Sequence, residues 1–189
     1  MKPERLAAFT DGVIAIVITI MVLELPTPHG DGLAALKPVL PLLFAYLLAF
    51  INVGIYWSNH HHLLQAAKKV DGRVLWANNA LLFCLSLVPF LIRWIGEEGV
   101  HALPVAAYGV ILILSAAFYL ILERALIAAE GEDSKIKGAV GAKQKEWISV
   151  AGYAAAIGLA FVSPYIAVAI YTLVTAMWLI PDRRFEFWR

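Results

Sequence analysis

Charged side chains are scarce in this sequence: only 15% of the 189 residues are Asp, Glu, Lys or Arg, against about 25% in an ordinary soluble domain. Hydrophobic residues make up 61%, and the mean hydropathy is +0.77. This composition excludes a typical soluble protein and predicts an integral membrane protein. At roughly 20 residues per span, the length allows at most about seven or eight helices. We therefore expect one membrane domain over residues 1–189, with no room for a soluble catalytic domain.

Cysteine is almost absent as well. Cys84 is the only one in the sequence, which excludes an intrachain disulfide and a cysteine-based metal site. The formal net charge is only +1 at pH 7, so bulk charge gives no indication of nucleic acid as a partner. The distribution of the positive residues along the chain is more informative than their sum.

Apolar runs separated by turn residues or charges predict an all-α protein with six transmembrane helices. We expect helices at about 7–25, 38–58, 74–95, 104–122, 147–162 and 164–180, with a polar loop at about 123–146. The last two are short, because Trp147 to Ile180 gives 34 residues for two crossings. This hairpin must be thin, tilted or incompletely spanning.

Lys and Arg are unevenly divided between the two ends of these helices. If both termini lie on one side, 13 of the 15 positive residues share that side, and only Lys37 and Arg93 lie opposite. The positive-inside rule then predicts cytoplasmic N- and C-termini and a multi-pass protein of the cell (plasma or inner) membrane. An odd number of spans would remove this asymmetry.

One carboxylate, Asp11, lies within the first apolar run. An ionised side chain near the bilayer centre costs roughly 3 kcal/mol on insertion scales, so a retained one usually has a partner and a use. On a helical wheel, Gly12, Ile16, Thr19, Ile20 and Leu23 share a face about 100° wide, and Asp11 points about 130° away from its middle. Periodicity alone does not distinguish this face from ordinary lipid-facing or helix-packing surface.

The start of the first helix reads Arg5-x-x-x-Phe9-Thr10-Asp11. It resembles the Arg-x-x-x-Phe-Ser-Asp signature of the transmembrane protein 175 family, the endosomal and lysosomal potassium channels of animals and their prokaryotic homologues. The likeness continues in the Leu-Glu-Leu-Pro exit, in Tyr56-Trp57-Ser58-Asn59-His60-His61-His62, in Asn78-Asn79 and in Leu85-Ser86-Leu87-Val88-Pro89-Phe90. Thr10 replaces the usual serine but keeps its hydroxyl. Helices four to six match mainly in number and length.

This resemblance implies a homotetramer around a central pore lined by the first helix. By position, Ile16 matches the narrowest hydrophobic constriction, and Ile20 and Leu23 continue the apolar lining. Thr19 matches a threonine near the permeation path that bears on potassium preference. The implied function is a potassium-selective cation channel with a hydrophobic gate, in which potassium ions and the lipid bilayer are partners. No cofactor is implied, and no metal beyond permeant potassium.

The sequence has no Thr-Val-Gly-Tyr-Gly loop, whose carbonyls replace the water of the ion in familiar potassium channels. Selectivity should therefore be modest. An arginine-rich voltage-sensing helix is also missing, so steep voltage gating is not expected.

The predicted topology brings three polar groups to one depth, and we expect a hydrogen-bonded network within each subunit. Thr10 and Asp11 would accept from Trp, His or Asn donors, and Arg5 would offset charge. The network would fix the rotation of helix one. Which histidine takes part is left open. The candidate members are Arg5, Phe9, Thr10, Asp11, Trp57, Asn59, His60, His61, His62, Asn78 and Asn79.

Two other function classes compete with the channel. Asp11 and the histidines suggest a proton relay, as in a proton-coupled secondary transporter or a proton-permeable channel. A metal site at His60, His61 and His62 would need a loop or outside ligands, because consecutive helical residues point about 100° apart. No nucleophile and base stand at a suggestive spacing, so we do not expect an enzyme.

Overall fold

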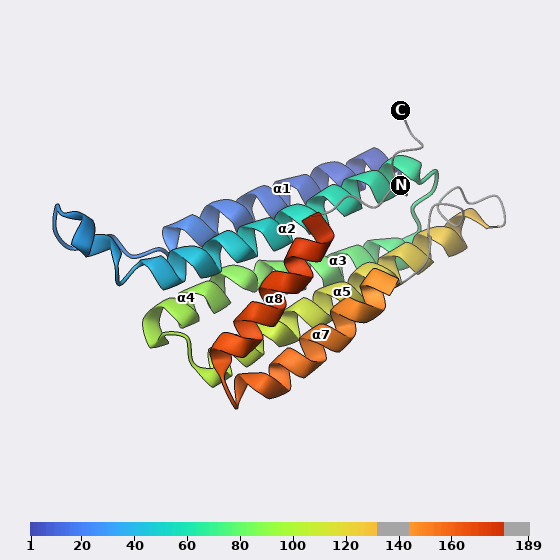
Figure 1. The fold of residues 1–189 in the computed structure, drawn as a ribbon. Coiled ribbons are helices and arrows are strands. Elements are labelled where there is room, and N and C mark those ends of the chain that lie inside the picture. Colours follow the sequence, from blue (N-terminus) through green and yellow to red (C-terminus); the bar gives the residue numbers. More distant parts are fainter. Residues whose placement is uncertain (132–143, 180–189) are drawn as a thin grey trace.

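The computed structural model describes residues 1–131 and 144–179, and all regular structure within these ranges is helical. The helices form an elongated bundle in which α1 and α2 lie side by side (Figure 1). In chain order the elements are α1 (Pro3–Leu23), the 3-10 helix η1 (Leu33–Leu36), α2 (Leu40–Ala66), α3 (Gly72–Ser86), α4 (Val88–Glu98), α5 (Ala102–Glu130), α7 (Gln144–Ala160) and α8 (Pro164–Leu179). The predicted all-α fold class is confirmed.

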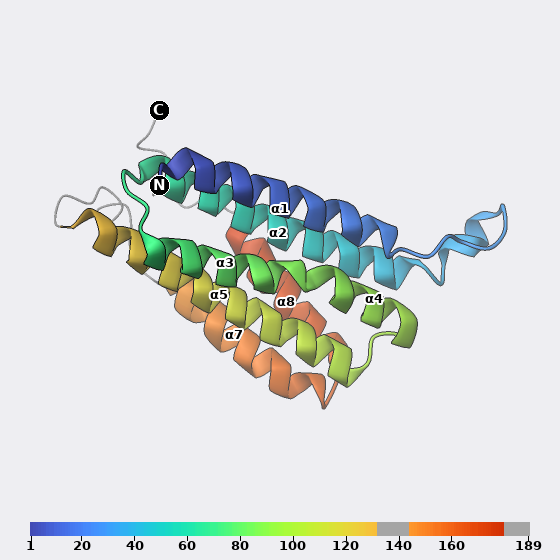
Figure 2. The ribbon, with the colours of Figure 1, turned by 180° about the vertical axis from the view of Figure 1, so that it is seen from behind.

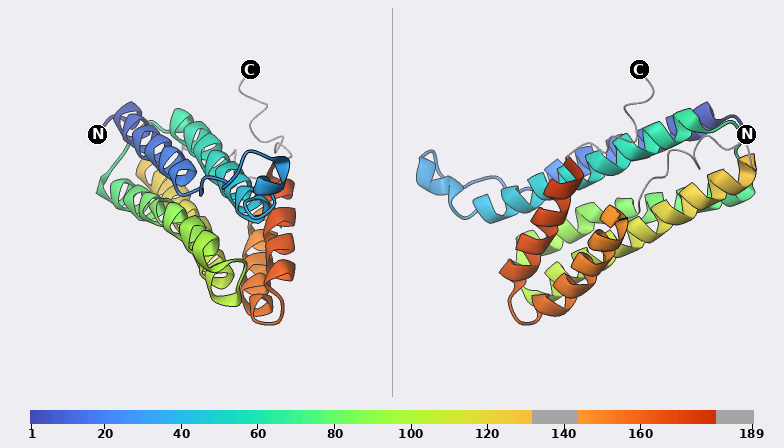
Figure 3. Two further views of the ribbon diagram at one scale, coloured as in Figure 1. Left: turned by 90° about the vertical axis from the view of Figure 1, so that its left-hand side faces the viewer. Right: turned by 45° about the vertical axis from the view of Figure 1, so that its right-hand side comes forward.

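Among residues 1–131 and 144–179, four helical segments are long and apolar enough to cross a membrane, namely α1, α2, the combined run of α3 and α4, and α5. The final hairpin has helices of 17 and 16 residues. At 1.5 Å per residue these are about 26 and 24 Å long, shorter than a hydrocarbon core of about 30 Å. The short hairpin expected from the sequence is therefore present. Figure 3 shows it folding back so that α8 reaches both α5 and α2.

The predicted single helix at 74–95 is in fact two. It is interrupted at Leu87, between α3 and α4. Pro89 has no backbone N–H to donate to the carbonyl of Leu85, so the helical ladder is broken there. The hydroxyl of Ser86 donates to the carbonyl oxygen of Phe83 at 2.7 Å, next to the break.

The predicted polar loop at 123–146 is wrong at both ends. Helix α5 continues to Glu130, and α7 begins at Gln144. Residues 123–130 contain only Glu, Arg, Ala, Leu and Ile, which favour helix, and the buried side chain of Leu126 keeps this part of α5 packed on the bundle. Helix α5 ends at Gly131, whose φ of 80° suits glycine. The charged residues at the start of 123–130 mark the end of the apolar segment, but helix α5 continues beyond them.

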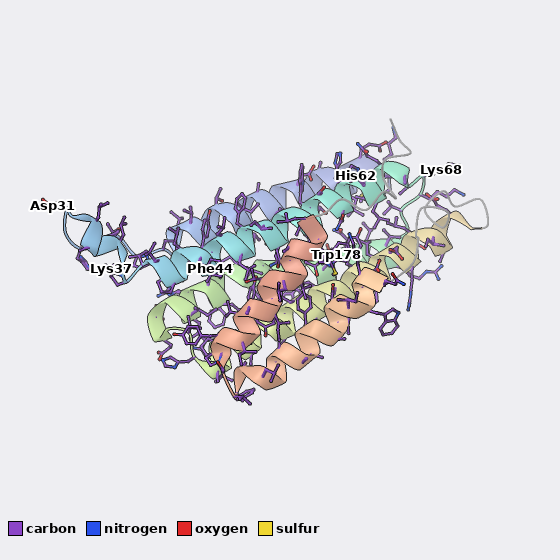
Figure 4. All side chains as sticks on the ribbon, in the orientation of Figure 1. Asp31, Lys37, Phe44, His62, Lys68 and Trp178 are labelled. Atoms are coloured by element: carbon purple, nitrogen blue, oxygen red, sulfur yellow. The ribbon has the colours of Figure 1, made fainter. Side chains whose placement is uncertain are left out.

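Several helices begin or end at the same end of the bundle, which we call the basic end. The amino group of Met1 donates to the carbonyl of Val70 at 3.1 Å, and the backbone N–H of Lys68 donates to the carboxylate of Glu130. Lys68 and Lys37 lie at opposite ends of the molecule (Figure 4). This arrangement agrees with the uneven distribution of Lys and Arg in the sequence.

Helix α3 starts at the basic end with Asp71 as its N-cap. The carboxylate of Asp71 accepts a hydrogen bond from the backbone N–H of Val74 at 3.0 Å. This bond, assisted by Arg73 at 3.4 Å, lowers the pKa of Asp71 below its usual value. The carboxylate therefore stays charged, and able to cap α3, throughout the neutral range.

Helix α5 lies between α3 and α7 in the bundle (Figure 2). It packs tightly against the hairpin at Gly109, where an added Cβ would lie 2.1 Å from the hydroxyl of Tyr171 and 2.7 Å from a side-chain carbon of Ile157. Tyr171 is 1% exposed, so its ring has no free space to move into. Glycine at this position lets α5, α7 and α8 pack closely.

Candidate pore helix and its polar support

Helix α1 has one packed face and one open face. Its buried residues recur at helical spacing and pack toward α2, α3 and α4; they are Leu6, Thr10, Ile14, Val17 and Met21. The residues predicted to line a pore lie on the opposite side. The exposed fraction is 58% for Ile16, 41% for Ile20 and 79% for Leu23, and Thr19 is exposed too. Within one chain, this apolar face is therefore left uncovered.

Thr19 is held in a definite orientation on the open face. Its hydroxyl donates to the carbonyls of Ala15 at 3.0 Å and Ile16 at 2.9 Å. A hydroxyl has one proton and two lone pairs, so the proton is used by the backbone while the oxygen keeps its capacity to accept. An oxygen of this kind can contact a cation.

A buried polar cluster joins α1, α2 and α3, and we call it the Asn78 cluster. The amide of Asn78 donates to the hydroxyl of Thr10 at 3.0 Å. The amide oxygen of Asn78 accepts from His60 Nε2 at 2.7 Å, which places the His60 proton on Nε2. All three side chains are at most 1% exposed. Of the three consecutive histidines, His60 is the one that is hydrogen-bonded to Asn78.

Asp11 is exposed and lies at the edge of this cluster, between the packed face and the open face of α1. Its carboxylate accepts a hydrogen bond from the indole N–H of Trp57 at 2.8 Å. The Trp57 ring stacks on His61 with centroids 5.8 Å apart, and His61 lies within 2.9 Å of the Gln65 amide. His62 has an edge-to-face contact with His61. The structure therefore gives Asp11 one donor, from α2.

Other members of the predicted network are not brought into it. Arg5 is exposed, and within residues 1–131 and 144–179 no ion pair or hydrogen bond joins it to Asp11. The expected offset of charge by Arg5 is therefore not seen. Phe9 is 55% exposed, Asn79 is exposed and Asn59 is half-buried. In the described part of the chain, no three His, Cys, Asp or Glu side chains are grouped as metal ligands.

Comparison with known proteins shows the family of this chain. The model of the family described as endosomal/lysosomal potassium channel TMEM175 matches residues 5–89. A protein of Chryseobacterium sp. named a potassium channel is 54% identical over 186 residues, covering 98% of this chain and 97% of that protein. The chain belongs to the TMEM175 family. It is therefore a multi-pass membrane protein of a family named for an ion channel, not for an enzyme.

Two more distant matches extend this result. A crystal structure of a lysosomal potassium-selective channel TMEM175 homologue from Chamaesiphon minutus has a TM-score of 0.78 at 23% identity, and the match covers 94% of this chain and 96% of that one. It shows that the two chains share a fold. The endosomal/lysosomal proton channel TMEM175 of Gallus gallus is 37% identical over 81 residues, or 36% of this chain and 16% of the chicken protein.

The TMEM175 segment 5–89 contains every member of the Asn78 cluster, but the structure has a second polar cluster that reaches beyond it. We call this the Asn52 cluster. The amide of Asn52 donates to the hydroxyl of Thr175 at 2.9 Å and to the carbonyl of Leu48 at 3.0 Å, and lies 3.5 Å from the hydroxyl of Tyr108. It ties α2 to α5 and α8. Sequence reasoning missed it, although an Asn in the middle of an apolar helix was a visible signal.

At the end opposite the basic end, the exit of α1 is linked to α4. Arg93 Nε lies 2.8 Å from the carboxylate of Glu97 and 3.8 Å from that of Glu24. Glu24 is the C-cap of α1. The carboxylate at the exit of the candidate pore helix is thus partly neutralised by a neighbouring helix.

Proposed function

We propose that this chain forms a potassium-permeable channel in which four subunits surround a pore lined by α1. The observation that carries the proposal is the potassium-channel relative, which is 54% identical across nearly the whole of both chains. At that identity the two chains share their fold, so the same helix is expected to serve the same purpose in both. The family match over residues 5–89 includes all of α1.

The open face of α1 supports the same function. Residues Ile16 and Ile20 are one helical turn apart, or roughly 6 Å along the axis, and Leu23 lies nearly one turn further. In a four-fold assembly they would form three successive apolar rings. The ring at Ile16 would gate by narrowing until water leaves the constriction. The Thr19 oxygen, whose proton is donated to the backbone, would offer a polar contact within this lining.

The Asn78 cluster and the Asp11–Trp57 hydrogen bond would set the rotation of α1. Both act on the side of the helix away from Ile16, and both connect α1 to helices of the same subunit. Asp11 then serves as a support for the pore helix rather than as an ion ligand. His61 and His62 lie next to Trp57 at the edge of this support, whereas Phe9, Asn59 and Asn79 stay outside it.

We further infer the orientation and location of the channel. The basic end holds Lys68, Lys69 and Arg73, so the positive-inside rule assigns it to the cytoplasm. For a chain with bacterial relatives this means the cell membrane. Conduction needs no catalytic group, and we propose no enzymatic activity.

Ion flux from purified protein in liposomes tests this proposal. We expect potassium efflux to be faster than sodium efflux from vesicles with the wild-type protein. In Ile16→Asn, part of the apolar barrier to ion flux should be lost. Flux through the variant should rise about tenfold or more, because a polar ring holds water where an apolar ring excludes it. Leu173→Asn on α8 is the matched control, since Leu173 is also exposed, at 69%. It should leave flux unchanged.

Three outcomes would contradict the channel, its gate or its assembly. Absence of potassium flux from correctly folded wild-type protein would remove the function itself. Equal flux and equal selectivity in wild type and Ile16→Asn would show that Ile16 is not the constriction. A particle without four-fold symmetry would contradict the assembly.

Proton permeation is a second candidate, favoured by the chicken relative that is named a proton channel. An internal pH dye in the same liposomes would separate the two. With an inward proton gradient and only impermeant cations on both sides, a proton pathway acidifies the lumen and a potassium pathway does not. Proton uptake that saturates and needs a co-substrate would instead indicate a proton-coupled transporter.

A further inference from the structure

A groove at the basic end lies between α3 and α5 and has no part of α1 in its lining. Its volume is about 600 Å³. The apolar part is formed by Trp76 and Ala80 from α3 and by Phe118 and Ile121 from α5. Trp76 is 76% exposed and Ile121 is 47% exposed, so the groove opens to the outside of the chain.

Two arginines, Arg73 and Arg124, stand at the end of the groove nearest the basic end. Both side chains are exposed. Arg73 pairs with Asp71 at 3.4 Å, whereas Arg124 has no ion pair among the residues that the structure describes. A smaller cavity of about 380 Å³ adjoins Arg73 and its partner Asp71, and adds Lys68 and Lys69. The mouth of the groove is thus strongly cationic.

The groove changes from charged to apolar along the helix axes. On α3 the lining runs from Arg73 to Ala80, and on α5 from Arg124 to Phe118, so both helices place the cation at the mouth and the apolar residues deeper. Seven residues of helix span about 10 Å. The sequence of charges and apolar surface over this length matches the headgroup and upper acyl chain of a phospholipid.

We propose that this groove binds a phospholipid with an anionic headgroup from the leaflet at the basic end. The phosphate contacts Arg124 and Arg73, and an acyl chain lies along Trp76, Ala80 and Ile121. Charge complementarity selects the headgroup, since basic pockets between membrane helices attract anionic lipids. Both helices belong to segments able to span a membrane, so the groove faces lipid when nothing else covers it. This site is separate from the proposed ion pathway on α1.

Quenching of Trp76 fluorescence by lipids with brominated acyl chains tests the proposal. Full-length protein is reconstituted in phosphatidylcholine vesicles that contain the same small fraction of brominated phosphatidylglycerol or brominated phosphatidylcholine. The Trp76 signal is the difference between each protein and its Trp76→Phe counterpart. We expect about fivefold stronger apparent binding of the anionic lipid for each arginine that contributes. Arg124→Gln should lower the preference about fivefold and leave the part that is due to Arg73.

Lys37→Gln provides the matched control, because Lys37 is an exposed cation at the opposite end of the molecule. It should leave the preference unchanged. If Arg124→Gln does not fold, Arg73→Gln tests the same headgroup contact independently. Equal quenching by the two brominated lipids in wild type would overturn the proposal. Absence of quenching by either would also overturn it, since it would mean that a second copy of the chain covers the groove.

Discussion

The two buried polar clusters of this protein are built on different principles. In the Asn78 cluster the hydrogen bonds run between side chains, with Asn78 as the shared partner of Thr10 and His60. In the Asn52 cluster two members also donate to a backbone carbonyl: Asn52 to that of Leu48 and Thr175 to that of Tyr171. Tyr171 in turn donates to the carbonyl of Val105. The first cluster depends on one residue, and the second has alternatives.

This difference bears on what each cluster is for. A network without backbone alternatives is stable only when every member is in place, so it specifies one arrangement of α1, α2 and α3. A network with backbone alternatives tolerates the loss of a member. Close packing then contributes more of the stability of that region than the hydrogen bonds do. The Asn78 cluster, which supports the candidate pore helix, is the one that needs every member in place.

The largest effect should come from Asn78→Leu. The change leaves the buried His60 and Thr10 without their shared partner, and an unsatisfied buried polar group costs about 1 to 3 kcal/mol. We expect a loss of about 3 kcal/mol, measured by reversible unfolding in mixed detergent and SDS. Asn79→Leu on the exposed side of α3 is the control and should have little effect. Equal stability of the two variants would mean that the cluster does not hold α1.

Gly109→Ala should rank second, and it tests whether packing dominates around the Asn52 cluster. A Cβ at this position would lie 2.1 Å from the Tyr171 hydroxyl, so Tyr171 must move and lose its bond to Val105. Overpacking of a core typically costs 1 to 3 kcal/mol, and we expect about 2 kcal/mol in the same unfolding assay. Gly158→Ala on α7 has open space around the new methyl group. A similar loss in both variants would refute the steric explanation.

The smallest effect should come from Asn52→Leu. Thr175 keeps its bond to the carbonyl of Tyr171, and single side-chain hydrogen bonds in membrane proteins average about 0.6 kcal/mol. We expect a loss of about 1 kcal/mol or less, well below that of Asn78→Leu. If the ranking of the two variants is reversed, the contrast between the clusters is wrong.

The sequence predicted the helices and the residues near the candidate pore better than it predicted helix ends and distant partners. The order of the helices followed from apolar runs, and the grouping of Asp11, Trp57, His60 and Asn78 followed from a motif and a topology. The apolar runs extend along the whole chain, whereas the motif lies in residues 5–89.

Three features were beyond that reasoning, for different physical reasons. The end of α5 was misjudged because Glu123 and Arg124 are charged, yet charge does not stop a helix when no Gly or Pro follows. The break at Leu87 had a signal in Pro89 that the apolar run obscured. The partners of Asn52 come from α5 and α8, and only the packed structure can bring those helices together.

The length of α2 implies that Asp11 lies at a shallower depth in the membrane than its place in an apolar run suggested. Helix α2 has 27 residues, or about 40 Å, which exceeds a hydrocarbon core of about 30 Å by nearly two turns. Its first turns are apolar, whereas His60, His61 and Gln65 stand near its last, so the surplus length projects into water at the basic end. Trp57 then lies within about one turn of the lipid headgroups, and so does the carboxylate it binds. This depth places Asp11 near the membrane surface, where the penalty for a charge is smaller than at the bilayer centre.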